Sequence, residues 1–500
     1  MSAEVRRYHE ITDSEAAAML ARIDRQGPAA RVLFRGATVV TMDPVIGDLA
    51  AGDLLSGDGV IQAVGEDLTD HPAAADAVTV EAGGMILMPG LIDSHRHAWQ
   101  AAFRRLIVDA DLDGYVATTH GGMAFGYRPD DMYLGSLASA LGAIETGITT
   151  ILDFSHNSRS GAHNDAVIRA YLDSGIRAVH AAAAPNAGPW DRQWPEDLLR
   201  LHDRSPGQLG PAERSRVTVR MGIDMNRVRP LPELVSFARS HGLGITIDGV
   251  HGTASSDEIL GLAADRLLGS DITVIHANDM DPAAWAALAA HGVGVTLAPT
   301  SDEQIGIADA LPPVQAAIDH GIRPSLSVDV EISLAGDLFS QMRCLLTTQR
   351  MNVTARRYRG EATLPALLTH REALEFATVR GAADLGLAGV TGSLTPGLAA
   401  DVVALRAEEL DNMPLNNAIG TIVQGVDSRH VDTVLVAGQV RKWRGRTTYA
   451  DVAGLRAQLL RSRDALADLA GWTPDPVRPP SNSRVTVDNL RTYLDARKTD

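Results

Sequence analysis

Short apolar runs alternate with amphipathic stretches eight times between residues 85 and 330, and this alternation constrains the fold more than any other feature. The runs are short and rich in β-branched residues, as in GITTILDFSH and ITVIHAND. The stretches between them, such as HNDAVIRAYLDSG, have the apolar spacing of helices that pack on a sheet. Eight such units predict an α/β fold with a parallel sheet closed into a (β/α)8 TIM barrel. A doubly wound open sheet is the alternative, but polar residues at nearly every strand end favour closure.

Strand-like segments also flank the barrel on both sides. RVLFRGATVVTM, GVIQAVG and AVTVEAGG precede it, and TGSLTPGLAADVVAL and VDTVLVAGQVRKW follow a predicted helical stretch over 364–387. We expect the two flanks to pair into one small β-sandwich domain. The predicted units are an N-terminal helical extension (1–30), the composite β domain (31–84 plus 388–450), the barrel (85–387) and a helical, then proline-rich tail (451–500).

Charge and cysteine content exclude several functional classes. The formal net charge is -17, which argues against a nucleic-acid partner because such proteins usually present a basic face. Cys344 is the single cysteine, so neither an internal disulfide nor a cysteine-based zinc site can form. We therefore expect a reducing compartment, the cytoplasm. No apolar run approaches the roughly 20 residues that span a bilayer, and the first 20 residues lack the apolar core of a signal peptide.

Polar side chains end most of the predicted strands, where the active sites of β/α barrels lie. His95 and His97 end the first strand two positions apart, so both imidazoles can face the same space. Convergent imidazole nitrogens and carboxylate oxygens suit a divalent metal ion, whereas any one of these histidines alone would more often be structural. Later strands end in further candidates: Asp153, His156, His180, Asp248, His251, His276 and Asp329.

Several segments resemble the amidohydrolase superfamily. PGLIDSHRHAWQ is similar to its first-strand signature PGxIDxHxH, and GITTILDFSH to its second strand. VIHAND resembles the sixth-strand histidine segment, and LSVDV the eighth-strand segment with the metal-binding aspartate. TGSLTPGLAADVVAL resembles the return to the small β domain, so the resemblance covers residues 31–445. The most similar subgroup holds the triazine chlorohydrolases and aminohydrolases, with the cytosine, guanine and adenosine-type deaminases nearby.

The resemblance implies a mononuclear site for one divalent metal ion, zinc first, with iron or manganese as alternatives. Its ligands by position are His95, His97 and Asp329, joined by the fifth-strand residue Asp248. Asp329 is expected to accept the proton of the attacking water, and His276 to hydrogen-bond the water or the substrate. Lys442 and Lys498 are the only lysines, so a binuclear centre bridged by a carbamylated lysine has no residue to form from.

The fifth strand departs from the family pattern. Asp248 occupies the place of a metal-binding histidine, and His251 the place of a catalytic glutamate three positions later. A carboxylate can bind zinc or a harder metal, although aspartate is shorter than histidine. His251 has the opposite strand parity to Asp248, so it reaches the site only if the strand has ended, which Gly249 and Gly252 permit. With that condition, His251 is a candidate catalytic residue beside Asp329 and His276.

The seventh strand departs as well. Thr300 stands where the subgroup has an acidic residue, and Ile307 where it has a histidine, while Asp302 and Glu303 remain nearby. These changes leave open a non-hydrolytic lyase or cyclase on the same barrel, or a metal-free binding protein.

The preferred hypothesis is a metal-dependent hydrolase that deaminates or opens a small nitrogen heterocycle at a non-peptide C–N bond. The partner is then a small molecule, with no nucleic acid and no membrane, and we expect a homo-oligomer. The candidate substrate-binding residues are Trp99, Gln100, His120, His156 and Asp302.

Overall fold

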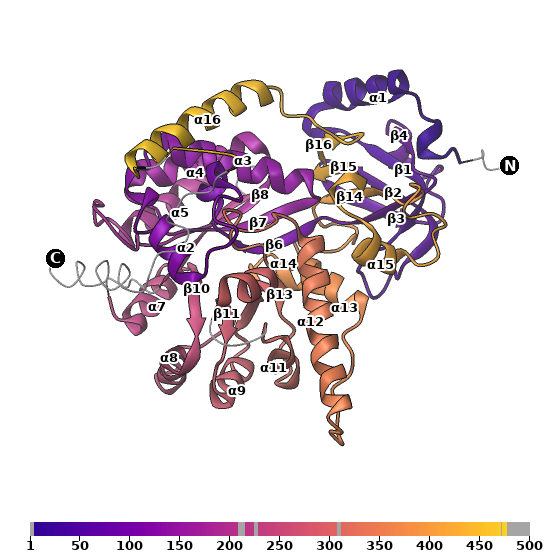
Figure 1. The fold of residues 1–500 in the computed structure, drawn as a ribbon. Helices are drawn as coiled ribbons and strands as arrows, with labels where there is room; N and C mark the ends of the chain where they lie inside the picture. Colours follow the sequence, from indigo (N-terminus) through magenta and orange to yellow (C-terminus); the bar gives the residue numbers. More distant parts are fainter. Residues whose placement is uncertain (1–4, 209–215, 225–228, 308–311, 472, 478–500) are drawn as a thin grey trace.

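The computed structural model describes residues 5–208, 216–224, 229–307, 312–471 and 473–477. Two sheets organise this part of the chain: one of eight parallel strands and one of nine strands of mixed direction (Figure 1). The parallel sheet is the predicted barrel. Among the described residues, no helix combines the length and the apolar character needed to cross a membrane.

The barrel strands follow one another in chain order, and each pairs in parallel with the next. Each strand is mostly buried, because helices cover the outer face and side chains fill the inside. The strands are β6 (Leu91–Arg96), β7 (Ile148–Ser155), β8 (Arg177–Ala182), β9 (Val217–Ile223), β10 (Gly244–His251), β11 (Ile272–Asn278), β12 (Gly294–Leu297) and β13 (Ser325–Leu326).

The first strand and the segment after the last strand complete the ring. β13 is only two residues long, and the Ser94 hydroxyl of β6 donates to its Leu326 carbonyl at 2.7 Å. The backbone pairing with β6 is made by the residues that follow β13. The Asp329 amide donates to the His95 carbonyl at 3.0 Å, and the His97 amide donates to the Asp329 carbonyl at 3.0 Å. The Asp93 carboxylate accepts the Val328 amide at 2.9 Å. The ends of the first and eighth strands are therefore tied at the rim that carries the polar side chains.

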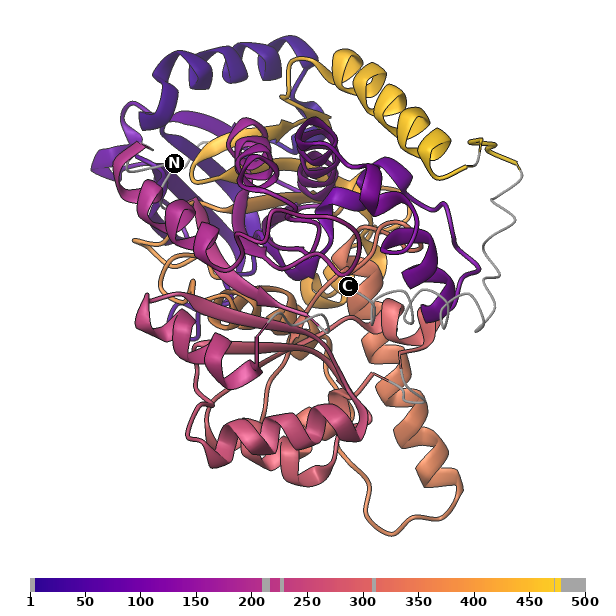
Figure 2. The same ribbon diagram turned by 90° about the vertical axis from the view of Figure 1, so that its left-hand side faces the viewer.

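Helices connect the strands and cover the barrel, as Figure 2 shows from a second side. They are α3 (Pro129–Glu145), α4 (Gly161–Ser174), α5 (Glu196–Gln208), α7 (Leu231–Ser240), α8 (Gly252–Ala264), α9 (Pro282–Ala290) and α11 (Val314–Asp319). Two shorter helices lie in the loops at the carboxyl ends of the strands: α2 (Leu112–Thr119) and α10 (Pro299–Ser301).

The helical segment after the eighth strand is longer than the predicted range 364–387. That range holds α13 (His370–Glu375) and α14 (Gly381–Asp384), but α12 (Leu338–Tyr358) precedes it. Asp337 caps α12 through the Ser340 amide at 2.8 Å. Polar residues, mainly Thr and Arg, interrupt the apolar spacing of α12, so the sequence alone did not predict this helix. Its far end projects from the body in both views (Figures 1 and 2).

The second sheet is built from both flanks of the barrel. Its strands run in the order β17-β16-β15-β14-β5-β1-β2-β3, with β4 beside β1, as one hydrogen-bonded network. Antiparallel pairing of β14 with β5 joins the two flanks. The strands are β1 (Val32–Val39), β2 (Leu49–Gly57), β3 (Val60–Gly65), β4 (Val78–Glu81), β5 (Met85–Pro89), β14 (Val402–Arg406), β15 (Val431–Val436), β16 (Gln439–Trp443) and β17 (Arg446–Thr447).

The chain leaves this sheet later than predicted. β5, at Met85–Pro89, pairs with β1 and β14, whereas the predicted boundary lies between residues 84 and 85. Gly90 separates β5 from β6, and a side chain there would overlap the Thr149 hydroxyl. The close approach at Gly90 therefore sets the point where the chain passes into the barrel.

Two terminal helices pack on the body. α1 (Asp13–Gln26) lies against the mixed sheet, where the Trp443 indole N–H donates to the Ala16 carbonyl at 3.0 Å. α16 (Val452–Leu469) lies along α3, and the Ser462 hydroxyl donates to Asp131 at 2.6 Å. α15 (Ala418–Gly420) lies between β14 and β15 in the chain.

We expect the substitution Asp93→Ala to destabilise the barrel strongly. Asp93 pairs with Arg96 at 2.5 Å, and both side chains are fully buried. The change leaves the buried guanidinium with only the more distant Glu331 carboxylate, at 3.5 Å, as an anionic partner, and removes the acceptor of the Val328 amide. The expected loss is about 3–5 kcal/mol in the free energy of unfolding, measured by denaturant unfolding. The control Asp464→Ala removes an exposed ion pair and should change stability by less than about 1 kcal/mol. Equal effects of the two changes would contradict this account of closure.

Candidate metal centre

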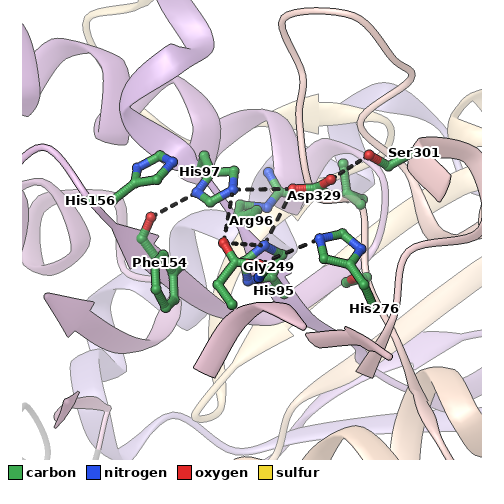
Figure 3. Close-up of polar contacts among 12 residues, drawn as sticks. His95, Arg96, His97, Phe154, His156, Gly249, His276, Ser301 and Asp329 are labelled. Atoms are coloured by element: carbon green, nitrogen blue, oxygen red, sulfur yellow. Dashed lines mark hydrogen bonds and ion pairs between the residues drawn. The ribbon is translucent and has the colours of Figure 1, made fainter. Parts of the chain in front are cut away.

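Five side chains from four places on the barrel rim converge on one buried point (Figure 3). His95 and His97 come from the end of β6, Asp248 from β10, His276 from β11 and Asp329 from the segment after β13. Both imidazoles of the first pair lie close to both carboxylates. Asp329 Oδ1 lies 3.3 Å from Nε2 of His95 and 3.2 Å from Nε2 of His97. Asp248 Oδ2 lies 3.7 Å and 3.6 Å from the same two nitrogens. His276 Nε2 lies 3.4 Å from Asp248 Oδ1. Their ligand atoms form two overlapping triads that share His95.

Unusual backbone angles turn these side chains inward. His276 has φ 72° and Asp329 has φ 64°, in the left-handed region that non-glycine residues rarely occupy. Each such residue costs on the order of 1–3 kcal/mol and persists where surrounding structure holds it. In β10, the pairing with β11 shifts between Ile247 and Val250, with Gly249 at φ 68°. This bulge lets Asp248 face the site from a strand that continues to His251.

Hydrogen bonds behind the cluster fix its orientation. His97 Nδ1 lies 2.9 Å from the Phe154 carbonyl, and His276 Nδ1 lies 2.8 Å from Asp302 Oδ1. The Ser301 hydroxyl donates to Asp329 Oδ2. Both imidazoles therefore direct Nε2 toward the carboxylates, which is how metal-binding histidines are commonly held.

The charges of the cluster depend on one another. Burial opposes ionisation at each group, yet the His95 and His97 imidazoles beside it bring the pKa of Asp329 well below its usual range. Burial also disfavours a protonated His97, but the nearby Asp329 and Asp248 carboxylates raise its pKa to about 9. The pKa of His276 is raised well above its usual value, against burial, by Asp248 and Asp302. The two carboxylates thus attract positive charge into this point from protons or from a cation.

His95 provides a specific test of whether a metal ion fits. Its ring is fully buried, and although Nε2 lies 3.3 Å from Asp329 Oδ1, neither nitrogen makes a hydrogen bond within the described part of the chain. A buried imidazole without partners is rare, because the unmet polar atoms are costly. A cation beside Nε2, held also by the carboxylates, would satisfy the ring. The donor set of imidazoles and carboxylates suits zinc, and also iron or manganese.

A cavity of about 220 Å³ opens beside the cluster. Five of the predicted ligands and catalytic residues, all except His95, line it together with His120 and His156, and helix α2 supplies part of its apolar wall. The lining residues are His97, Leu112, Asp113, Tyr115, Val116, His120, His156, Asn186, Asp224, Asp248, Gly249, His251, His276, Ser301, Ile305, Ile307 and Asp329.

Three of the residues predicted to bind substrate lie behind this wall instead. Trp99 is fully buried and donates its indole N–H to His156 Nδ1 at 3.2 Å. Gln100 is fully buried and donates to the Tyr115 hydroxyl at 2.7 Å. Asp302, 2% exposed, sits under His276. Each hydrogen-bonds to a residue that lines the cavity. The short helical turn after β6, which holds Trp99 and Gln100, and the turn after β12, which holds Asp302, point these side chains into the protein interior.

The residues that depart from the family pattern also have defined places in the structure. His251 lines the cavity because of the bulge at Gly249. The sequence predicted this position only if the strand had already ended, whereas β10 continues to His251. Thr300 hydrogen-bonds to Gln341, and Ile307 contributes to the apolar wall. Asp153 and His180 pair with each other at 3.3 Å and do not line the cavity.

Several lining residues were not predicted. Ser301, Asn186 and Asp224 lie at or just after strand ends, and Asp224 ends the fourth strand in VTVRMGID. Their place at a strand end was the available signal. Most of the other unpredicted lining residues come from helix α2 and the turn after β12. No local sequence pattern indicates that these two segments approach the rim.

A parallel β/α barrel with a buried His/Asp cluster at the carboxyl ends of its strands suits a divalent metal ion, and comparisons with known proteins show what the chain is similar to. Residues 233–441 match the amidohydrolase family. A 5-methylthioadenosine/S-adenosylhomocysteine deaminase of Pelotomaculum thermopropionicum is 26% identical over 429 residues, covering 82% of this chain and 93% of that protein. Over these residues the chain is therefore similar to members of the amidohydrolase family.

Solved structures share the fold. A mutant of atrazine chlorohydrolase from Arthrobacter aurescens TC1, complexed with zinc and atraton, has a TM-score of 0.74 at 24% identity, covering 86% of this chain and all of that chain. An adenosine deaminase from Xanthomonas campestris with bound zinc has a TM-score of 0.73 at 20% identity, covering 87% and 98% of the two chains.

Metal binding should release protons and strengthen as the pH rises. In the metal-free protein the pKa of His97 is about 9, so at neutral pH its ring carries a proton that a cation must displace. We expect zinc affinity to increase between pH 6 and pH 9. Calorimetric titration at pH 7 in buffers with different ionisation enthalpies should show net proton release. Affinity that is constant across this range, with no proton release, would contradict the cluster as the binding site.

The substitution Asp302→Ala should lower the affinity for zinc without removing a proposed metal ligand. Removing the Asp302 carboxylate frees His276 to rotate, and the expected loss is about 10–100-fold in zinc affinity or activity. Asp302→Asn keeps an acceptor for Nδ1 and should recover part of the loss. The neighbouring acid provides a matched control, since Glu303→Ala removes contacts to Thr348 and Cys344 only. If Asp302→Ala binds zinc like wild type, Asp302 does not position His276.

Proposed function

We propose that this protein is a metal-dependent hydrolase that deaminates a small nitrogen heterocycle at a non-peptide C–N bond. The observation that carries the proposal is the convergence of His95, His97, Asp248 and Asp329 beside a cavity that also holds His276. The printed activities of the relatives, deamination of adenosine-type compounds and hydrolysis of triazines, suggest the class of ring.

The metal ion would be held by His95, His97, Asp248 and Asp329, with His276 beside it. Zinc is the first choice because two of the similar structures carry it. A bound divalent cation supplies Lewis acidity that lowers the pKa of water enough for hydroxide to form near neutral pH.

Asp329 is proposed as the group that accepts the proton of the attacking water. Its Oδ1 faces the imidazoles that would hold the metal ion, and the Ser301 hydroxyl donates to its Oδ2, so the orientation of the carboxylate is fixed. The proton can then pass to the departing amino group. His276, oriented by Asp302, directs Nε2 to the same space and would hydrogen-bond the water or the substrate.

His251 is proposed as a second proton carrier, in the place of the glutamate found in many deaminases. Its ring lines the cavity, and both burial and the charge of His276 lower its pKa, so it is neutral at physiological pH and can accept a proton. The exchange of Asp248 and His251 relative to the family pattern would keep one carboxylate and one imidazole at this strand end while swapping their positions.

The proposal extends to a homo-oligomer in the cytoplasm. The single cysteine, Cys344, suits a reducing compartment, and homo-oligomers are common in the family. Light scattering on the purified protein measures the oligomeric state.

Activity is tested on a panel of heterocycles, by ammonia release from adenosine, 5-methylthioadenosine and S-adenosylhomocysteine, and by chloride release from atrazine-type chlorotriazines. We expect turnover of at least one compound by the zinc-loaded protein, and a loss of about 10²–10⁴-fold in kcat for Asp329→Asn. The control Asp319→Asn changes an exposed helical carboxylate and should leave kcat unchanged.

The panel also separates the alternatives. Product that forms without release of ammonia or another leaving group would indicate a lyase or cyclase. Full zinc occupancy with no change in any compound would contradict the proposed hydrolysis, and failure to bind any divalent metal would point to a binding protein.

A further inference from the structure

A pair of stacked histidines forms one wall of the cavity. His156, which follows β7, lies parallel to His97 with ring centroids 4.0 Å apart and an interplanar angle of 10° (Figure 3). His120 meets the His156 ring edge-on at 4.3 Å. All three side chains line the cavity. His156 is thus held by contacts on its face and edge and cannot turn freely.

Trp99 determines which nitrogen of His156 carries the proton. The Trp99 indole N–H donates to His156 Nδ1 at 3.2 Å. An indole N–H can only donate, so Nδ1 must offer a lone pair, the ring must be neutral, and its hydrogen must be on Nε2.

Trp99 itself is fixed. Its ring is fully buried and meets Tyr127 edge-on at 4.9 Å, and the Tyr127 hydroxyl donates to the Trp99 carbonyl at 3.2 Å. A rigid indole therefore presets the tautomer of His156 before any substrate enters.

We propose that His156 is a specificity-determining residue that donates its Nε2–H to an acceptor on the substrate. The acceptor is a pyridine-type ring nitrogen, or a carbonyl oxygen, at the edge of a planar heterocycle. The identification of the ligand as a heterocycle rests on the proposed function, whereas the tautomer rests only on the contact with Trp99.

The apolar part of the cavity lining strengthens the selection for a ligand with an acceptor. Leu112, Val116, Ile305 and Ile307 line the cavity with apolar side chains that hold no water in place by hydrogen bonds. In such surroundings a donor left without an acceptor is costly, so a ligand with C–H or N–H at this point binds less well. Ile307 replaces the usual seventh-strand histidine, so this lining position offers no hydrogen-bonding side chain, whereas His156 remains a fixed donor.

The tautomer is tested by NMR on the zinc-loaded full chain labelled with ¹⁵N-histidine. His156→Gln identifies the His156 signals by their loss. We expect Nδ1 of His156 to have the chemical shift of an unprotonated, pyridine-type nitrogen and Nε2 that of a protonated one. The opposite tautomer, or a ring protonated on both nitrogens, would overturn the proposal.

The donor is tested by binding two ring compounds of the same shape, measured by calorimetry. Purine carries acceptor nitrogens in its six-membered ring, and benzimidazole has C–H groups in their place. We expect wild type to bind purine about tenfold more tightly than benzimidazole. His156→Gln, which keeps an N–H near Nε2, should retain the preference, and His156→Phe should lose it.

Trp99→Phe should weaken the preference because the tautomer is released. Trp194→Phe is the matched control, since it removes a buried indole hydrogen bond, to the Ala182 carbonyl, and Trp194 does not line the cavity. Equal affinities in wild type, or a preference that survives His156→Phe, would overturn the proposal. Because binding is measured without turnover, this outcome is independent of whether the protein deaminates any compound.

Discussion

Asp329 joins the closure of the barrel to the assembly of the site. Its backbone bonds to His95 and His97 across the seam between the first and last strands, and its side chain faces the same two imidazoles. The left-handed backbone at Asp329 makes both roles possible at one residue. Since the seam and the ligand set share these residues, a barrel that closes correctly also brings the ligands together.

The buried charges of the cluster then require compensation. Two carboxylates, Asp248 and Asp329, lie out of water within reach of three imidazoles, and burial of unpaired charge is costly. Without a cation the imidazoles must carry protons, as the raised pKa values of His97 and His276 indicate. With a cation the same rings are neutral ligands. The supporting bonds from Phe154, Asp302 and Ser301 hold the same orientation in either state.

Much of the architecture could be predicted from periodicity, because alternation of strands and helices repeats eight times and polar residues lie at or near most of the strand ends. The His95/His97 pair shares a strand face, so its convergence follows from strand geometry alone. The sequence predicted His251 at the site on the condition that the strand had ended; the bulge at Gly249, which shifts the strand by one residue, could not be predicted. Likewise Trp99, Gln100 and Asp302 face inward, and the depth of a side chain within a loop leaves no trace in the sequence.

The central claim is that one cation binds where these strands end. It is tested most directly by X-ray diffraction from zinc-loaded crystals at wavelengths on either side of the zinc absorption edge. The account predicts a single anomalous peak in this region, within bonding distance of His95, His97, Asp248 and Asp329. A peak elsewhere in the molecule, or two separate peaks among these side chains, would contradict it.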